Sequence, residues 1–401
     1  MWLAAVLAVG ITGSAVADGA GDQPGPLVRC LGIDGRFIEG HLVGLSPEAV
    51  TIGGNPPIRL SCEEQVRVDF VDSRAMHAPR SMLALTNGDR LSFVPESSDG
   101  DLIRGLCPLD TSEHAHAIPL EFVHDVWLNA PEVPSLRRTL ERTLATGRFA
   151  DDTLLLRNGD LLTAPLIGLH EGHITLDSAS APVEAATDDV IAIACNRQLS
   201  SRPERSEHIF LFELTDGSWV SAHDFRHGTG AVSLAWIGDQ RLSVRLQHVR
   251  SIRFFGTCVT AISDLEPHSW QHAPWLDGTW PPVTNRSVVH STLDMGRRQW
   301  PRGLGMHSQS EVSWRIERGY QTFLAVVGID AAAEGGGSVR FAIDADGARI
   351  WQSGEVSGAD EPHATGPIDV SAVDELTLIV LFGDNGDLLD YANWCDAVLV
   401  K

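Results

Sequence analysis

Polar and apolar side chains alternate along Glu311-Val312-Ser313-Trp314-Arg315-Ile316, and the same period of two runs through Ser338-Val339-Arg340-Phe341-Ala342-Ile343. This is the period of a β-strand with one buried face. The second stretch leads into Asp346-Gly347, a strong hairpin signal. Leu376 to Leu381 is apolar, as in a buried strand. The C-terminal third is therefore predicted to be a β-sandwich with ligand loops at one end.

Several landmarks of this third occur in a fixed order. They are Ser263-Asp264-Leu265, Trp275-Leu276, Trp280-Pro281, Gly303-Leu304-Gly305-Met306-His307-Ser308, Val327-Gly328-Ile329-Asp330, Asp346-Gly347, the stretch from Asp384 to Asp390, and Trp394. In this order they resemble the NPCBM family, the novel putative carbohydrate-binding module, which implies a galactose-binding-like β-sandwich of the jelly-roll type. The resemblance covers residues 257–401 and implies that this domain binds a carbohydrate. It does not extend to the first two-thirds of the chain.

Seven of the chain's 11 tryptophans lie in this domain. Indole faces stack on the apolar faces of sugars. Trp270, Trp275 and Trp280 lie in a proline-rich segment without a strand pattern, and one of them is expected to be an exposed sugar platform, with core packing as the alternative. Trp314 and Trp351 are expected in the core. An imidazole both donates and accepts hydrogen bonds. The resemblance places His307 in the ligand region, and a purely structural histidine is the alternative.

Acidic residues are concentrated just before the end of the chain. Asp384, Asp387 and Asp390 could hold Ca²⁺, which prefers oxygen ligands, or could bond sugar hydroxyls. The NPCBM family typically shows Asp-His-Ala-Asp-Trp where this chain has Asp390-Tyr391-Ala392-Asn393-Trp394. Asp390 and Trp394 are retained and are expected to contact the ligand. A solvated acidic turn is the alternative.

The region from Leu27 to Gly256 contains four similar hairpin signals. Their glycines are Gly35, Gly88, Gly159 and Gly217, and each turn is expected to need positive φ. Each unit also ends on an apolar strand. The sequence therefore predicts an all-β protein, with about four small SH3-like or Sm-like barrels before the sandwich, because closure removes exposed strand edges.

Five segments follow from this division. They are an export signal at 1–17, two barrel-like repeats at 27–130, a linker at 131–150, two more repeats at 151–256, and the sandwich at 257–401. The linker is predicted to contain a short helix from Ser135 to Leu144, preceded by prolines and followed by Gly147.

The overall composition and charge exclude some classes of binding partner. The 401 residues are 43% hydrophobic and carry a formal net charge of −23. Such a charge argues against nucleic acid and anionic membranes as partners. No apolar run is long enough to span a bilayer, and the A-x-A pattern Ala15-Val16-Ala17 predicts a secreted, periplasmic or cell-surface protein.

The six cysteines permit disulfides in an exported chain. Cys30 and Cys62, on a first and a late strand of one unit, form the predicted pair, and buried free thiols are the alternative.

Three functions remain open. The first is an exported, non-catalytic protein that binds a galactose-like glycan or polysaccharide and uses its repeats as a scaffold. The second is a carbohydrate-active hydrolase or its accessory subunit, although no nucleophile-elbow or phosphate-loop motif is present. The third is an adaptor whose repeats bind protein partners through their strand edges.

Overall fold

The computed structural model describes residues 25–179, 181–238, 240–275 and 278–401. Within these residues the protein is almost entirely β, with one α-helix, so the all-β prediction is confirmed. The export signal predicted at 1–17 lies outside the described residues. No helix in the described part of the chain is long and apolar enough to cross a membrane.

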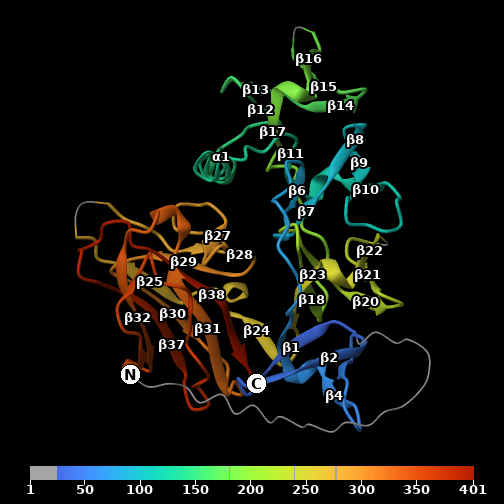
Figure 1. The fold of residues 1–401 in the computed structure, drawn as a ribbon. Helices are drawn as coiled ribbons and strands as arrows, with labels where there is room; N and C mark the ends of the chain where they lie inside the picture. Colours follow the sequence, from blue (N-terminus) through green and yellow to red (C-terminus); the bar gives the residue numbers. More distant parts are fainter. Residues whose placement is uncertain (1–24, 180, 239, 276–277) are drawn as a thin grey trace.

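The four predicted units form an array that runs vertically in Figure 1. The first contains β1 Leu27–Gly32, β2 Phe37–Leu45, β3 Ala49–Ile52, β4 Ile58–Ser61, η1 Cys62–Glu64 and β5 Gln65–Phe70. The second contains β6 Met82–Leu85, β7 Arg90–Ser92, β8 Val94–Ser98, β9 Leu102–Leu106, β10 His116–Pro119, η2 Leu120–Phe122 and β11 Val123–Trp127.

The helix α1 Pro134–Thr146 follows. The third unit contains β12 Thr153–Leu156, β13 Leu161–Thr163, β14 Leu166–His170, β15 His173–Leu176, β16 Val183–Ala186, η3 Thr187–Asp189 and β17 Val190–Ala194. The fourth contains β18 Ile209–Leu214, β19 Trp219–Ala222, β20 Asp224–His227, β21 Ala231–Ala235, β22 Arg241–Arg245, η4 Leu246–His248 and β23 Val249–Phe255.

The same order of elements thus occurs in each unit: an opening hairpin, a meander, a 3₁₀ turn and a closing strand. All four predicted turn glycines have positive φ, between 75° and 94°. A Cβ at Gly88, Gly159 or Gly217 would meet nothing within 4 Å, so the backbone angle explains these glycines better than lack of space does. The hairpin predictions are confirmed. That the units are diverged copies stays a prediction.

The expected closed barrels are not observed. Within the described residues β4 and β5 do not pair, and the opening and closing strands of all four units instead belong to one 14-stranded sheet. Closing strands pair across units, β11 with β17 and β23 with β5. The spatial order of the units is therefore third, second, fourth, first, as the colours of Figure 1 show. Pairing with a neighbour protects the edges that closure was expected to remove.

The long sheet has two unlike faces, because direct cross-strand partners lie on the same face. On one face, apolar partners such as Val68 and Ile252, and Leu83 and Val126, belong to one continuous core. The other face carries a mostly polar row of successive partners. It consists of Glu39, Arg29, Asp69, Ser251, Glu213, Trp219, Arg90, Ala84, Asp125, Ala194 and Thr153.

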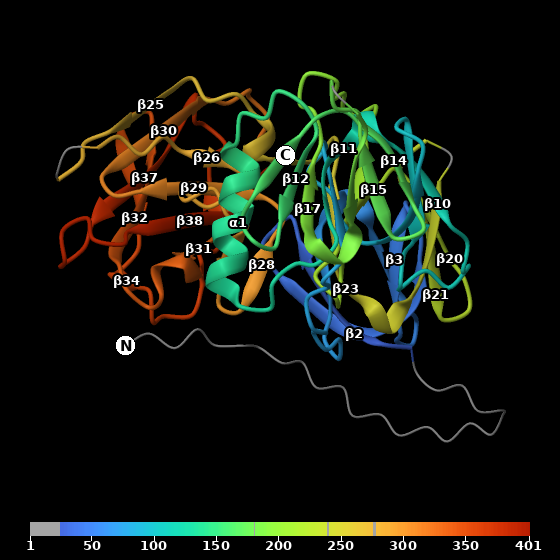
Figure 2. The ribbon, with the colours of Figure 1, turned by 90° about the horizontal axis from the view of Figure 1, so that it is seen from above.

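The predicted linker helix is present and packs against the polar face. Its buried residues are Arg137, Glu141 and Leu144, whereas Leu136 is 48% exposed. The buried face is rotated from the expected leucine stripe because Glu141 lies 3.7 Å from both Arg137 and the buried Arg90. Figure 2 shows α1 between the array and the C-terminal domain.

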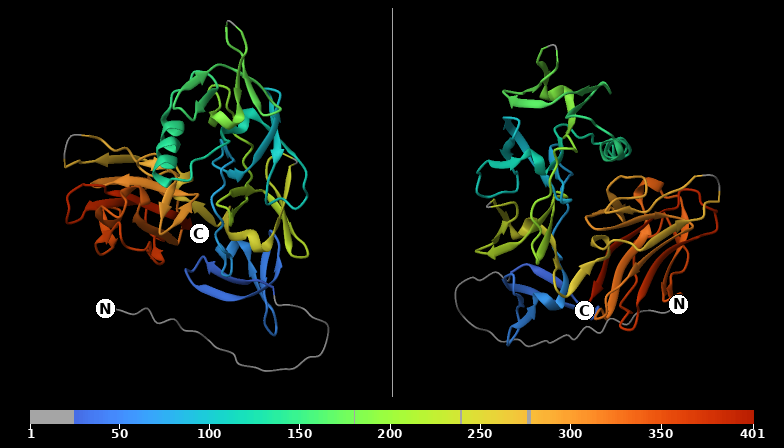
Figure 3. Two further views of the ribbon diagram at one scale, coloured as in Figure 1. Left: turned by 45° about the horizontal axis from the view of Figure 1, so that its top comes forward. Right: turned by 180° about the vertical axis from the view of Figure 1, so that it is seen from behind.

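The C-terminal domain is a two-sheet sandwich, as predicted. Its first sheet contains β24 Val259–Ala261, β26 Val283–Thr284, β29 Gly303–His307, β31 Thr322–Ile329, β35 His363–Ala364, β36 Ile368–Asp369 and β38 Tyr391–Val400. Its second contains β25 Ser269–His272, β30 Ser310–Arg315, β32 Ser338–Ala345, β33 Ala348–Gln352, β34 Val356–Ser357 and β37 Glu375–Phe382. The remaining elements are η5 Ile262–Asp264, η6 Ala331–Ala333 and the hairpin β27 Leu293–Met295 and β28 Arg298–Trp300. The sandwich lies along one side of the array (Figure 3).

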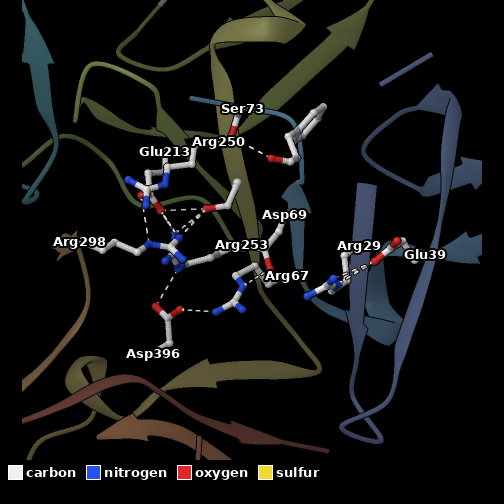
Figure 4. Close-up of polar contacts among 12 residues, drawn as sticks. Arg29, Glu39, Arg67, Asp69, Ser73, Glu213, Arg250, Arg253, Arg298 and Asp396 are labelled. Carbon is white, nitrogen blue, oxygen red and sulfur yellow. Dashed lines mark hydrogen bonds and ion pairs between the residues drawn. The ribbon is translucent and has the colours of Figure 1, made fainter. Parts of the chain in front are cut away.

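A buried group of charges joins sandwich and array, and we call it the interface ion cluster (Figure 4). It consists of Arg67, Asp69, Glu213, Arg250, Arg253, Arg298 and Asp396. Nε of Arg253 donates to Asp396 of β38 at 2.7 Å, and Nη2 of Arg298 donates to Glu213 of β18 at 2.5 Å. These contacts fix the sandwich against the polar face.

The predicted Cys30–Cys62 disulfide is wrong, because both residues are free thiols in the structure. Both are buried in the core of the first unit. Burial raises the pKa of each thiol to about 12, so the two residues behave as small core side chains.

Candidate functional site

Aromatic side chains from three segments meet at one end of β29. Trp280 stacks on the imidazole of His307, with ring centroids 4.8 Å apart and 11° between the planes. Tyr391 lies 6.0 Å from both rings and is the cross-strand partner of His307. The structure thus brings together the proline-rich segment, the glycine-flanked histidine and the end of the acidic loop, which are far apart in the sequence.

One backbone carbonyl defines the tautomers of two histidines here. The oxygen of Ser308 lies 2.8 Å from Nδ1 of His307 and 3.1 Å from Nε2 of His272. Because a carbonyl only accepts, both nitrogens carry protons. Nδ1 of His272 accepts a hydrogen bond from the Trp280 backbone at 3.3 Å. Burial lowers the pKa of His307, so its ring is neutral at neutral pH.

The outward surface of this group is formed by the tryptophans. His307 is only 3% exposed, because Trp280 lies over it. Trp275 is 67% exposed and meets the ring of Phe382 edge-on at 5.7 Å. The Trp275 backbone donates to Asp387 at 3.2 Å. We call Trp275, Trp280, Tyr391 and Asp387 the tryptophan surface.

Two predicted contact residues lie inside the domain instead. Trp394 is fully buried and packs against Phe341 and Trp351, because β38 is flanked by strands on both sides and turns this side chain into the core. Asp390 is also fully buried. Its carboxylate accepts from the Ser308 hydroxyl and, at 2.9 Å, from the Ser338 backbone. Trp394 is therefore not a stacking platform, and Asp390 connects three segments beneath the surface.

The three aspartates of the predicted calcium site have separate protein partners. Asp384 accepts from Arg340 at 3.2 Å, Asp387 accepts from the Trp275 backbone, and Asp390 is bonded in the interior. Within the described residues no group of three His, Cys, Asp or Glu side chains is arranged to hold a metal ion. The geometry does not gather Asp384, Asp387 and Asp390 into a ligand set.

Comparison with known families agrees with the fold of the C-terminal domain. Residues 259–400 match the family described as the NPCBM/NEW2 domain. The C-terminal domain is an NPCBM/NEW2 domain. The resemblance predicted for residues 257–401 is confirmed, and the match leaves the array outside the family. No curated protein sequence matches the chain at a significant level.

Solved structures with some likeness include two from Clostridium perfringens. The CBM51 from Clostridium perfringens GH95, in complex with methyl-galactose, is 22% identical, with 35% of this chain and 99% of that chain covered and a TM-score of 0.33. The CBM51-2 and INT domains of Clostridium perfringens ZmpB are 23% identical, with 46% of this chain and 37% of that chain covered and a TM-score of 0.32. Our chain thus spans well under half of the ZmpB structure.

Some residues of the NPCBM/NEW2 domain site gave no signal in the sequence. His272 ends an exposed edge strand, and Phe382 only continues the apolar run from Leu378 to Leu381 at the end of β37. Neither belongs to a motif. Alternation along β25 could have placed His272 on one face with Trp270, but the contact with Trp280 depends on a loop that the strand pattern does not position.

Proposed function

We propose that this protein is a non-catalytic glycan-binding protein and that its NPCBM/NEW2 domain binds a sugar on the tryptophan surface. The observation that carries the proposal is the 67% exposure of Trp275 beside the Trp280–His307 stack. An exposed aromatic surface bordered by polar side chains, here Tyr391 and Asp387, is typical of a ligand-binding site. The family match supports the same conclusion.

Each member of the surface has a chemical role in this proposal. The indole of Trp275 or Trp280 stacks on the apolar face of the sugar ring. The Tyr391 hydroxyl and the Asp387 carboxylate bond the hydroxyl groups. His307, which Trp280 covers, acts as a positioning residue: it holds the indole plane at a fixed angle and does not touch the sugar.

The finer features of the proposal concern ligand and context. A galactose-like sugar is the ligand predicted from the family resemblance. The array serves as a scaffold that presents the domain, because the interface ion cluster fixes the two parts together. The protein acts outside the cytoplasm, as predicted from residues 1–17.

Calorimetry with the full chain and methyl galactoside tests this site. Replacing a stacking aromatic typically costs about 2 kcal/mol or more, whereas millimolar binding amounts to about 4 kcal/mol in total. We expect Trp280→Ala and Trp275→Ala to reduce binding by at least tenfold. His307→Ala should reduce it less, because it only loosens Trp280.

Trp270→Ala is the matched control, because Trp270 is an exposed indole (44%) on β25 outside the Trp280–His307 stack. If this control weakens binding as much as Trp280→Ala does, the platform is assigned to the wrong residues. If the full chain binds neither galactosides nor other glycans on an array, the sugar-binding proposal fails. A chelator should leave the affinity unchanged, because the three aspartates have separate protein partners.

A further inference from the structure

A large cavity lies between the array, α1 and the NPCBM/NEW2 domain, away from the tryptophan surface. Its volume is about 660 Å³, which is the size of a small-molecule site. Strands β6, β7, β11 and β19 supply one wall, α1 a second, and the loops around β26 and β28 a third. We call it the central cavity.

The sheet wall of the central cavity is part of the polar row. Ala84, Arg90, Asp125 and Trp219 line it. The Arg90 guanidinium lies 5.5 Å from the centre of the Trp219 ring and 3.7 Å from Glu141 of α1. The Trp219 indole nitrogen donates to the Gly88 carbonyl at 2.7 Å. Charged groups and an indole are therefore held in fixed positions along this wall.

A β-bulge places His124 beside Asp125. The register of β11 against β6 shifts between Val123 and Asp125, which leaves His124 as the extra residue. A bulge of this kind re-aims a side chain, and Nδ1 of His124 bonds Asp125. The second carboxylate oxygen accepts from the Trp127 indole at 2.8 Å. Nε2 of His124 has no protein partner among the described residues, and this side chain is 25% exposed.

The cavity lining includes further groups of both charges. Arg286 makes one hydrogen bond, to the His290 carbonyl at 3.3 Å, and forms no ion pair with any residue that the structure describes. Asp89 is buried, and one of its oxygens accepts from the Ser221 backbone at 2.9 Å and from Asn87 at 3.0 Å.

We propose that the central cavity is a second carbohydrate site, which takes a neutral mono- or oligosaccharide. Sugar hydroxyls donate and accept, so they can bond Asp89, His124 and Arg286 together. Both charge signs line the cavity, which disfavours a strongly anionic or cationic ligand. Tryptophan in the wall suits the apolar faces of the sugar. The site goes beyond the tryptophan surface and does not depend on it.

The test uses the full chain, with a panel of methyl galactoside, methyl glucoside, methyl mannoside and N-acetylglucosamine, measured by calorimetry. Ala84→Phe fills the sheet wall of the cavity, and Ala348→Phe on the exposed strand β33 is its matched control. Arg286→Ala removes one wall group without breaking an ion pair, and Arg59→Ala on β4 is its control. Trp280→Ala removes the tryptophan surface alone.

We expect Trp280→Ala to retain binding of at least one sugar. When added to Trp280→Ala, Ala84→Phe and Arg286→Ala should each weaken that binding at least tenfold, while the controls do not. The inference is overturned if Trp280→Ala binds none of the four sugars, or if neither cavity substitution changes the binding that Trp280→Ala retains. Loss of all binding in Ala84→Phe alone, with Trp280→Ala unchanged, would refute the tryptophan surface and leave the central cavity standing.

Discussion

The interface ion cluster and the central cavity occupy neighbouring parts of one sheet face, but their polar groups are used differently. In the cluster, Glu213 is bonded by Arg253 and Arg298 and is almost completely buried. In the cavity, Arg286 and Nε2 of His124 can still form hydrogen bonds to a ligand. The same row of polar residues therefore has two uses. Where its side chains form ion pairs, they hold the sandwich against the array. Where they stay partly unpaired, they can bind a ligand.

The largest effect should come from breaking the cluster. Glu213→Gln removes the anion shared by Arg253, which is 2% exposed, and Arg298. Losing one partner of a buried ion pair typically costs about 3–5 kcal/mol. We expect the free energy of unfolding in urea to fall by about that amount.

Glu39→Gln is the matched control. Its partner is Arg29 on the same sheet face, and both side chains are more than 40% exposed (Figure 4). Exposed pairs contribute about 0–1 kcal/mol. Equal losses from the two substitutions would show that burial does not distinguish the two regions.

Acid should weaken the cluster in a defined window. Burial alone would raise the pKa of Glu213, but Arg298 and Arg253 overcome this effect and lower it from 4.5 to about 2. The unfolded state therefore takes up the proton first, and stability is lost as the pH falls from about 4.5 toward 2. The shift corresponds to roughly 3 kcal/mol. Unfolding measured across this window should show a smaller pH dependence in Glu213→Gln, and an unchanged slope would contradict the assignment.

Two turn glycines with similar backbone angles allow an effect on the cavity to be told apart from an effect on the stability of the array. Gly88 lines the central cavity with φ of 94°, and Gly159 has φ of 91° in the third unit. Alanine in this left-handed region costs about 1 kcal/mol, so both variants should lose similar stability. Only Gly88→Ala should also alter sugar binding in the Trp280→Ala background, as measured by calorimetry.

The smallest expected effect is the loss of stability on removing Arg286 from the central cavity. Arg286→Ala removes a single hydrogen bond to a carbonyl, which contributes about 0.5–1.5 kcal/mol at most. Urea denaturation should therefore give a change at the lower end of that range. A loss as large as that of Glu213→Gln would mean that Arg286 supports the fold and is not free for a ligand.

Local features of this fold could be predicted from the sequence, and long-range pairing could not. The glycine turns depend on two or three neighbouring residues, so Gly88 and Gly159 were predictable. Pairing of Arg67 with Arg253 across β5 and β23 leaves no local pattern. The burial of Glu213 could not be predicted for the same reason. The alternation of side chains along one strand does not indicate which face of the sheet another domain will cover.

The candidate site shows the same division. The pairing of His307 with Tyr391 follows from the sandwich topology, whereas the position of Trp280 over His307 depends on a loop. The interior position of Trp394 was missed because Tyr391-Ala392-Asn393-Trp394 shows no clear alternation, and all but Tyr391 are buried. The central cavity had no signal at all, because its walls come from units whose order in space differs from their order in the chain.

The spatial order of the four units also affects how the chain folds while it is being synthesised. Strand β5 ends at Phe70, yet its partner β23 begins at Val249, so a newly made first unit keeps an open edge while nearly 180 further residues emerge. At about 5–20 residues per second this exposure lasts on the order of ten seconds or more. Asp396, which neutralises Arg67 and Arg253, arrives later still. The nascent chain is therefore expected to need shielding by chaperones until its last strand is made.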